Sequence, residues 1–143
     1  MLVSNVLEEK GTLVVTVDRT ASIGEVVAGL TRHRVGALVV SPDGITIEGI
    51  VSERDIVQRL SVLHTDLLEE PVSSIMSASV RVCRSSDDVE SIRQMMTDHR
   101  IRHVPVVENG RLCGIISIGD VVKSRIHDLE KDRNELMEYI TAR

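Results

Sequence analysis

The chain has 143 residues, 42% of them hydrophobic and 27% charged, a balance typical of a folded globular protein and far from that of a disordered one. The formal net charge of −5, and the presence of Tyr139 as the sole aromatic residue, argue against nucleic-acid binding, which needs a basic face and stacking platforms. Because neither a signal segment nor an apolar run of roughly 20 residues is visible, we expect a soluble, cytoplasmic protein that does not bind membranes.

The first half of the chain predicts a strand, a helix, a β-hairpin and a second helix. The strand covers residues 13–17, and Ser22 is placed to cap the helix that follows. The hairpin strands lie near residues 37–40 and 47–51, on either side of a Ser41-Pro42-Asp43-Gly44 turn. Residues 64–71 are the expected linker to the second half. The helix is predicted by the i, i+3, i+4, i+7 spacing of apolar residues at Ile23, Val26, Val27 and Leu30.

The second half predicts the same order of elements. A strand over residues 80–83 precedes a helix with Asp87 at its start, and the hairpin strands cover residues 103–107 and 112–117 around an Asn-Gly turn. Residues 124–143 extend the last helix as an amphipathic segment. We expect this segment to pack on its own domain, on a dimer mate or on a regulated partner. Its apolar residues, at roughly heptad spacing, are Val122, Ile126, Leu129, Leu136 and Ile140.

The two halves are a tandem duplication. The segment His33-Arg34-Val35 recurs as His99-Arg100-Ile101, and Gly49-Ile50-Val51-Ser52 recurs as Gly114-Ile115-Ile116-Ser117. One unit of about 60 residues is close to the lower limit for an independent core. The predicted fold class is therefore α+β, with two β-α-β-β-α repeats packed with pseudo-twofold symmetry and a C-terminal helical extension.

Linked motifs in these repeats resemble those of the cystathionine-β-synthase (CBS) domain family, over about residues 3–122. They are Val72-Ser73-Ser74-Ile75-Met76, the stretch from His99 to Val106, and Gly-x-x-Ser-x-x-Asp in both halves. The resemblance implies a free-standing pair, with one CBS domain at residues 1–66, a second at 67–123 and the extension at 124–143. It also implies a homodimer that binds AMP, ADP or ATP between the repeats, or else NAD or S-adenosylmethionine, and that regulates an unknown protein in trans.

The resemblance assigns the ribose hydroxyls to Asp55 and Asp120 and the phosphate to Ser52 and Ser117. A Ser that ends a strand and begins a helix presents its hydroxyl beside free backbone N–H groups, an arrangement that attracts anions. The same Ser-x-x-Asp pattern is also that of a capping box, which needs no ligand. Both interpretations stay open from the residues alone.

The repeats differ just after the first helix, where Arg102 and His103 stand in the second repeat and Gly36 and Ala37 in the first. In similar modules this position reaches phosphate, so we expect Arg102 and His103 to serve the ligand held by Asp55. Gly36 and Ala37 would let a base approach in the cleft of Asp120. The alternative for Arg102 and His103 is an ordinary exposed basic edge. Weaker candidates for ligand contact are Thr16, Arg34 and Arg54, whose positions in a strand, at a helix end and on an exposed helix face need no ligand to explain them.

Other functional classes have little support in the residues. His99 and His103 have the spacing of a zinc helix, but no Glu follows His99 and Pro105 would break the helix. Because a metal site needs three or four convergent ligands, we expect no metal. Cys83 and Cys113 are predicted to be buried strand thiols. Nucleophile-elbow and phosphate-loop motifs are absent from the sequence, so we expect no enzyme and no catalytic cofactor. The alternative function is a structural interaction or dimerisation module with vestigial clefts.

Overall fold

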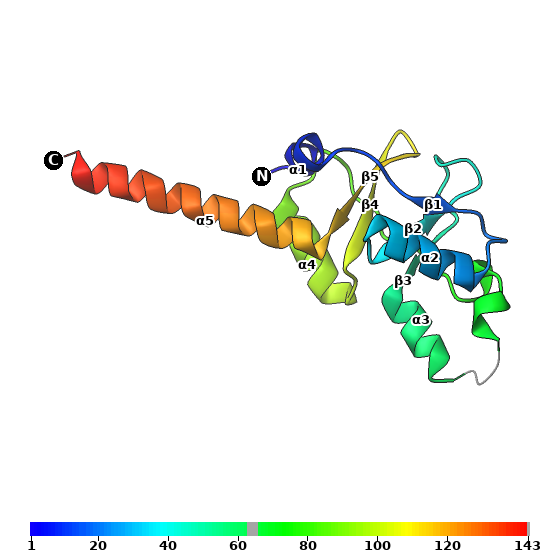
Figure 1. Cartoon of the computed structure of the whole chain (residues 1–143). Helices are drawn as coiled ribbons and strands as arrows, with labels where there is room; N and C mark the ends of the chain where they lie inside the picture. Colours follow the sequence, from blue (N-terminus) through cyan, green and yellow to red (C-terminus); the bar gives the residue numbers. More distant parts are fainter. Residues whose placement is uncertain (63–65, 143) are drawn as a thin grey trace.

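Two small β-sheets form the centre of the computed structural model, which describes residues 1–62 and 66–142 (Figure 1). In the first sheet, β1 (Thr16–Val17) pairs in parallel with β2 (Ala37–Val40), and β2 pairs antiparallel with β3 (Gly49–Ser52). The second sheet is an antiparallel pair, β4 (His103–Glu108) and β5 (Arg111–Ser117). Together with the helices these sheets confirm the predicted α+β fold of two repeats.

Each hairpin is preceded and followed by a helix. Helix α2 (Ile23–His33) and helix α3 (Glu53–Leu60) flank the first hairpin, and α4 (Val89–His99) and α5 (Ile118–Thr141) flank the second. Two short 3₁₀ helices, Leu67–Glu69 and Val72–Ser74, lie between the repeats. The part of the predicted linker at residues 64 and 65 falls outside the described residues, as does Arg143.

Some predicted elements are shorter or begin elsewhere. The predicted strand over 80–83 is reduced to a single parallel bridge between Cys83 and Val106. Asp87 does not cap α4, because the N-cap residue is Asp88, and the Asp87 carboxylate instead accepts a hydrogen bond from the Arg84 N–H at 2.8 Å. Strand β3 begins at Gly49 because Asp43 accepts backbone bonds from Ile45 and Thr46 (2.8 and 2.7 Å), which hold the preceding residues in a loop.

The N-terminal helix α1 (Val3–Lys10) was not predicted. Its three buried residues, Val3, Val6 and Leu7, pack with the second repeat, in a cluster that includes Ile92 and Val104. The first repeat has its own cluster, which includes Leu38 and extends to Leu67 and Val72. The division at residues 66 and 67 stays a prediction, but the apolar clusters do not follow it, since the first repeat is inserted between two parts of the second core.

Glycines permit close packing at matched places in the two repeats. A Cβ built on Gly49 would lie 2.6 Å from Met76 Sδ, and one on Gly114 would lie 2.8 Å from Leu7 Cδ2. The segment before each repeat therefore crosses the hairpin of the other repeat, with Met76 over β3 and Leu7 over β5. This crossing positions the residues that follow Met76 and Leu7 beside the helix starts described below.

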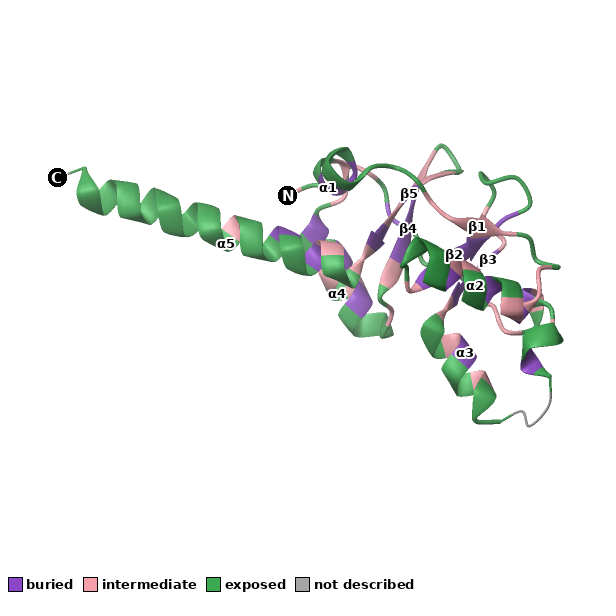
Figure 2. Cartoon of the chain, viewed as in Figure 1, coloured by how far each residue is buried: buried purple, intermediate pink, exposed green. Residues whose placement is uncertain are grey.

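Helix α5 runs without a break from the second repeat into the predicted C-terminal extension. Val121 and Ser124 are buried at its base, and Figure 2 shows the helix beyond them exposed as it leaves the body of the molecule. The apolar residues of the predicted stripe are about half exposed here. They are Val122, Ile126, Leu129, Leu136 and Ile140.

Candidate functional site

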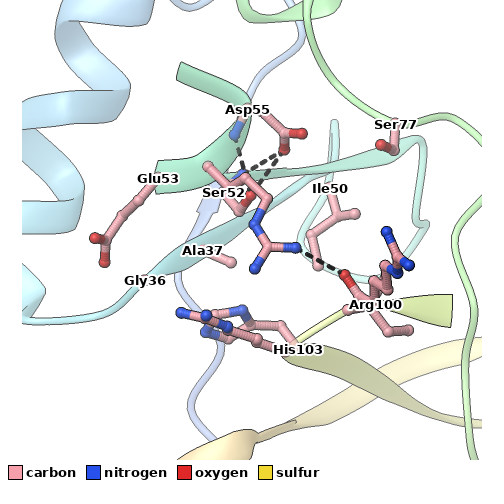
Figure 3. Close-up of a pocket in the computed structure, with 12 residues that line it drawn as sticks. Gly36, Ala37, Ile50, Ser52, Glu53, Asp55, Ser77, Arg100 and His103 are labelled. Atoms are coloured by element: carbon pink, nitrogen blue, oxygen red, sulfur yellow. Dashed lines mark hydrogen bonds between the residues drawn. The ribbon is translucent and has the colours of Figure 1, made fainter. Parts of the chain in front are cut away.

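A pocket of about 190 Å³ lies where the start of α3, in the first repeat, meets the second repeat. Ser52, Asp55 and Ser77 lie on one side of it, and Arg100 and His103 lie on the other (Figure 3). The pocket also includes Arg102, so the structure brings Ser52, Asp55, Arg102 and His103 together from the two repeats. These four residues, which were expected to lie together, therefore line one pocket.

Ser52 and Asp55 form a reciprocal cap at the start of α3. The Ser52 hydroxyl accepts a hydrogen bond from the Asp55 N–H at 3.4 Å, while Asp55 Oδ2 accepts from the Ser52 N–H at 2.8 Å and the Ser52 hydroxyl at 3.0 Å. The capping interpretation is therefore correct for this structure. It leaves Asp55 Oδ1 without a hydrogen bond from the described residues, so this oxygen can still accept donors from a ligand.

Ser117 and Asp120 repeat this cap at the start of α5, with one addition. Asp120 Oδ2 accepts from the Ser117 N–H (2.8 Å) and hydroxyl (2.9 Å), and it also accepts from Lys10 Nζ at 2.7 Å. Burial raises the pKa of Asp120, but the bonds from Lys10 and Ser117 outweigh it and hold the pKa below 3.8. A small pocket of about 60 Å³ lies between α1 and α5, and Lys10, Asp120, Lys123 and His127 are among the residues that line it.

His103 is the histidine among the residues that line the Asp55 pocket. Burial lowers its pKa below 6.5, and the nearby cations Lys10 and Arg102 act in the same direction, against the carboxylates of Glu53 and Asp120. His103 is therefore mainly neutral at pH 7 in the absence of a ligand. An anion placed beside it would favour the protonated, doubly donating form.

Gly36 and Ala37 line the same pocket as Asp55. This differs from the prediction, which placed them in the cleft of Asp120. The reason is the pairing of Ala37 with Ser52 across the first hairpin, which fixes both at the mouth of the α3 cap. A Cβ on Gly36 would lie 3.0 Å from Glu53 Oε1 and 3.1 Å from His103 Cε1. A larger residue at position 36 would fill the entrance to the pocket.

The three weaker candidates lie in different places. Arg54 lines the pocket, and its Nη1 donates to the Arg100 carbonyl at 3.0 Å, which links the two repeats. Arg34 caps α2 in the left-handed conformation and faces a separate groove between α2 and α3. Thr16 lies in β1, and neither it nor Arg34 is among the described residues that line the Asp55 pocket.

Sequence reasoning missed several residues of the two helix starts. Ser77, Ile50, Glu53, Arg100 and Ile101 line the Asp55 pocket, and all of them lie within or directly beside the motifs already noted. Lys10 is different, because it is outside both repeats and its approach to Asp120 depends on the packing of α1. The signal that could have found its segment is Val3-Ser4-Asn5-Val6-Leu7, which is similar to Val72-Ser73-Ser74-Ile75-Met76.

The described residues contain no cluster of three or more His, Cys, Asp or Glu side chains that could hold a metal. Burial raises the pKa of the Cys83 thiol to about 12, so it is not a ready nucleophile, and Cys113 is half-buried in β5. None of the described helices has the length and apolarity of a membrane span. A cytoplasmic location stays a prediction.

Comparison with known proteins identifies relatives over nearly the whole chain. The mitochondrial CBS domain-containing protein CBSX3 of Arabidopsis thaliana is 33% identical, over 96% of this chain and 71% of its own. The crystal structure of the CBS-domain containing protein ATU1752 from Agrobacterium tumefaciens is 44% identical and has a TM-score of 0.84, with 87% of this chain and 99% of that chain covered.

A solved CBS domain pair of protein MJ0100, in complex with 5′-methylthioadenosine and S-adenosyl-L-methionine, has a TM-score of 0.76 over 91% of this chain and 98% of that chain. At 24% identity this likeness shows the fold alone. The sequence model of the CBS domain matches two segments of the chain, residues 12–62 and 72–127, which correspond to the two repeats. The chain therefore belongs to the CBS domain family and contains a tandem pair of these domains.

Proposed function

We propose that this CBS domain pair is a non-catalytic regulatory module that binds an adenine nucleotide, AMP, ADP or ATP, in the pocket at Asp55. The observation that carries the proposal is the convergence of Ser52, Asp55, Arg102 and His103 on one pocket, from two repeats. A carboxylate, a helix-start hydroxyl and basic side chains are the groups that a ribose and a phosphate require.

The geometry suggests a role for each group. Asp55 Oδ1 would accept bonds from the ribose hydroxyls, since Oδ2 is already used by the Ser52 cap. The phosphate would lie near the Ser52 hydroxyl and within reach of Arg102 and His103. The base would lie against the aliphatic side chains of Ile50 and Ile101, because the pocket has no aromatic lining residue among the described residues.

The size of the pocket limits how much of the ligand it encloses. Sites for drug-sized ligands span about 300–1,000 Å³, and the Asp55 pocket has about 190 Å³. The pocket therefore suits the sugar and phosphate, with the rest of the nucleotide at the entrance. The adenosyl ligands of the MJ0100 domain pair fit this ligand class, but the choice among AMP, ADP, ATP, NAD and S-adenosylmethionine rests on experiment.

Calorimetric titration with these five ligands tests the proposal. We expect an adenine nucleotide to bind the wild-type chain with Kd in the micromolar range, about −8 kcal/mol, and Asp55→Ala to weaken it by at least about tenfold. Asp132→Ala, an exposed change on α5, is the matched control and should bind normally. Binding by none of the ligands would overturn the proposal in favour of a structural interaction module.

The output of nucleotide binding is proposed to reach another protein through a homodimer of these modules. Support comes from apolar side chains left exposed on the helices, such as Val57 and Leu60 on α3 and Val122 on α5, at 65%, 53% and 51% exposure. A nucleotide would act by binding one arrangement of the dimer more tightly than another. Sedimentation and small-angle scattering with and without nucleotide test this part, and an unchanged monomer in both would contradict it.

A further inference from the structure

Lys10 and Ser77 each bond to the carbonyl beside a helix start, although they are not matched in sequence, since Leu7 matches Met76 and the counterpart of Ser77 is Glu8. The Ser77 N–H donates to the Ile50 carbonyl at 2.9 Å, and Lys10 Nζ donates to the Ile115 carbonyl at 2.9 Å. Ile50 and Ile115 are matched residues of the duplicated Gly-Ile-x-Ser segment. The carbonyl beside each helix start is therefore satisfied in both repeats, by a backbone group in one and by a lysine side chain in the other.

The consequence for the two clefts is different. Ser77 is small and leaves the space in front of Asp55 open, so it lines the larger pocket. Lys10 extends its side chain to Asp120, where Nζ lies 2.7 Å from Oδ2. The ammonium thus lies on the carboxylate whose counterpart would receive a ribose.

The position of Lys10 is fixed by the packing of α1. Lys10 is the last residue of this helix, and Val3, Val6 and Leu7 bury the other face in the second core. Two backbone bonds also hold its start, from the Val3 N–H to the Asp87 carbonyl at 2.9 Å and from the Val89 N–H to the Met1 carbonyl at 2.9 Å. The lysine side chain is 31% exposed and Asp120 17% exposed, so both partners are shielded from water.

We propose that Lys10 closes the Asp120 cleft, so that the chain presents one nucleotide site, at Asp55, instead of two. This inference rests on the proposed function, because the ligand of both clefts is taken to be the same. A nucleotide entering at Asp120 would have to displace the Lys10 ammonium, which donates one hydrogen bond to the Asp120 carboxylate and another to the Ile115 carbonyl. The Asp55 cleft imposes no such cost.

The alternative role for Lys10 is to bind the phosphate of a nucleotide in its own cleft, together with Lys123 and His127. The geometry favours closure, because Nζ is bonded to Asp120 and Ile115, and Lys123 is 75% exposed with Glu9 as its partner at 3.6 Å. The two roles predict opposite effects of removing the lysine: closure predicts a gain of binding, and a phosphate ligand predicts a loss.

Equilibrium dialysis with AMP separates these roles when the second cleft is isolated in an Asp55→Ala background. Lys10→Ser copies the residue type of the open cleft at position 77, and Lys10→Arg keeps the cation. We expect Asp55→Ala/Lys10→Ser to bind AMP at least about tenfold more tightly than Asp55→Ala. Adding Asp120→Ala should abolish the gain, and Lys10→Arg should show none. Thermal melting checks that each variant is folded.

The outcomes distinguish this inference from the proposed function. If wild-type binding requires Asp55 but Lys10→Ser adds no site, closure is wrong and the nucleotide function stands. If the wild type does not bind AMP but Lys10→Ser does, closure stands and the function at Asp55 fails. Weaker binding in Lys10→Ser, two sites in the wild type, or no binding by any variant would each overturn closure.

Discussion

The two helix starts of this protein are nearly identical within themselves and differ in what lies in front of them. Both have a Ser and an Asp that cap each other with the same bonds, at distances that agree within 0.1 Å. In front of the first lies Ser77 and an open pocket, and in front of the second lies Lys10. The comparison teaches that a duplicated motif does not guarantee a duplicated site, because a segment outside the repeat can fill one copy.

The residues flanking the clefts add a second difference. Gly36 and Ala37 of the first repeat and Arg102 and His103 of the second meet at the same pocket, so that one cleft has both the small entrance residues and the basic groups. The cation beside Asp120 is Lys10, whose ammonium already donates a hydrogen bond to the Asp120 carboxylate. Divergence of the repeats therefore concentrates the proposed binding groups at Asp55.

The largest expected effect is a loss of unfolding free energy, and it tests whether the two repeats unfold as one cooperative unit. Ile92→Ala and Val26→Ala remove matched residues of α4 and α2, which are 1% and 0% exposed. We expect losses of unfolding free energy of about 2–5 kcal/mol for the first and somewhat less for the second. Because α1 precedes the first repeat in the sequence but packs in the second core, urea unfolding should show one transition in both variants. Two separated transitions would mean that the repeats are independent.

The next effect distinguishes the two crossing segments. Gly49→Ala places a Cβ against Met76 and also 3.0 Å from the Ser77 carbonyl, whereas Gly114→Ala meets only the ends of the Leu7 side chain among its three nearest atoms. Overpacking costs about 1–3 kcal/mol, and we expect Gly49→Ala near the upper end and Gly114→Ala near the lower. Chemical denaturation measures both. An equal cost would contradict the difference in packing.

A smaller effect comes from the ion pair between Lys10 and Asp120, which has no counterpart at Asp55 among the described residues. Lys10→Met should lower the unfolding free energy by about 1 kcal/mol at neutral pH, since a partly buried Asp120 loses its charged partner. The pKa of Asp120 is lowered in the folded state, so this contribution is present above pH 3.8 and is lost as the pH falls through the folded-state pKa. Denaturation of both proteins at several pH values should show the difference shrinking in acid. A constant difference would mean that Lys10 acts through packing alone.

The smallest effect concerns the basic side of the open cleft. Burial lowers the pKa of His103, and a bound phosphate would raise it, so nucleotide binding should take up a proton. We expect AMP affinity to increase by about threefold between pH 8 and pH 6.5, less than the tenfold that one fully linked proton would give per pH unit. His103→Gln should flatten this dependence in parallel titrations. An unchanged slope in the variant would assign the proton to the nucleotide itself.

The sequence by itself determined the repeated architecture and the two caps. The internal match from Gly49 to Ser52 and from Gly114 to Ser117, with apolar residues at helical spacing, was enough for two repeats, since such local patterns fix which backbone groups are paired. Ser-x-x-Asp likewise specified its own hydrogen bonds over three residues. The exact strand lengths and the cap of α4 were less certain, because element ends depend on neighbours in space.

Only the tertiary structure decided which cleft is open. Helix α1 has eight residues, too few for its apolar spacing to be read as a helix, and its apolar face is buried only by packing against core residues that lie between positions 83 and 121. The bond between Lys10 and Asp120 spans 110 positions in the chain and follows from that docking. Local chemistry could define each helix start, but the occupant of the space in front of it is set by long-range packing, which no spacing within the chain records.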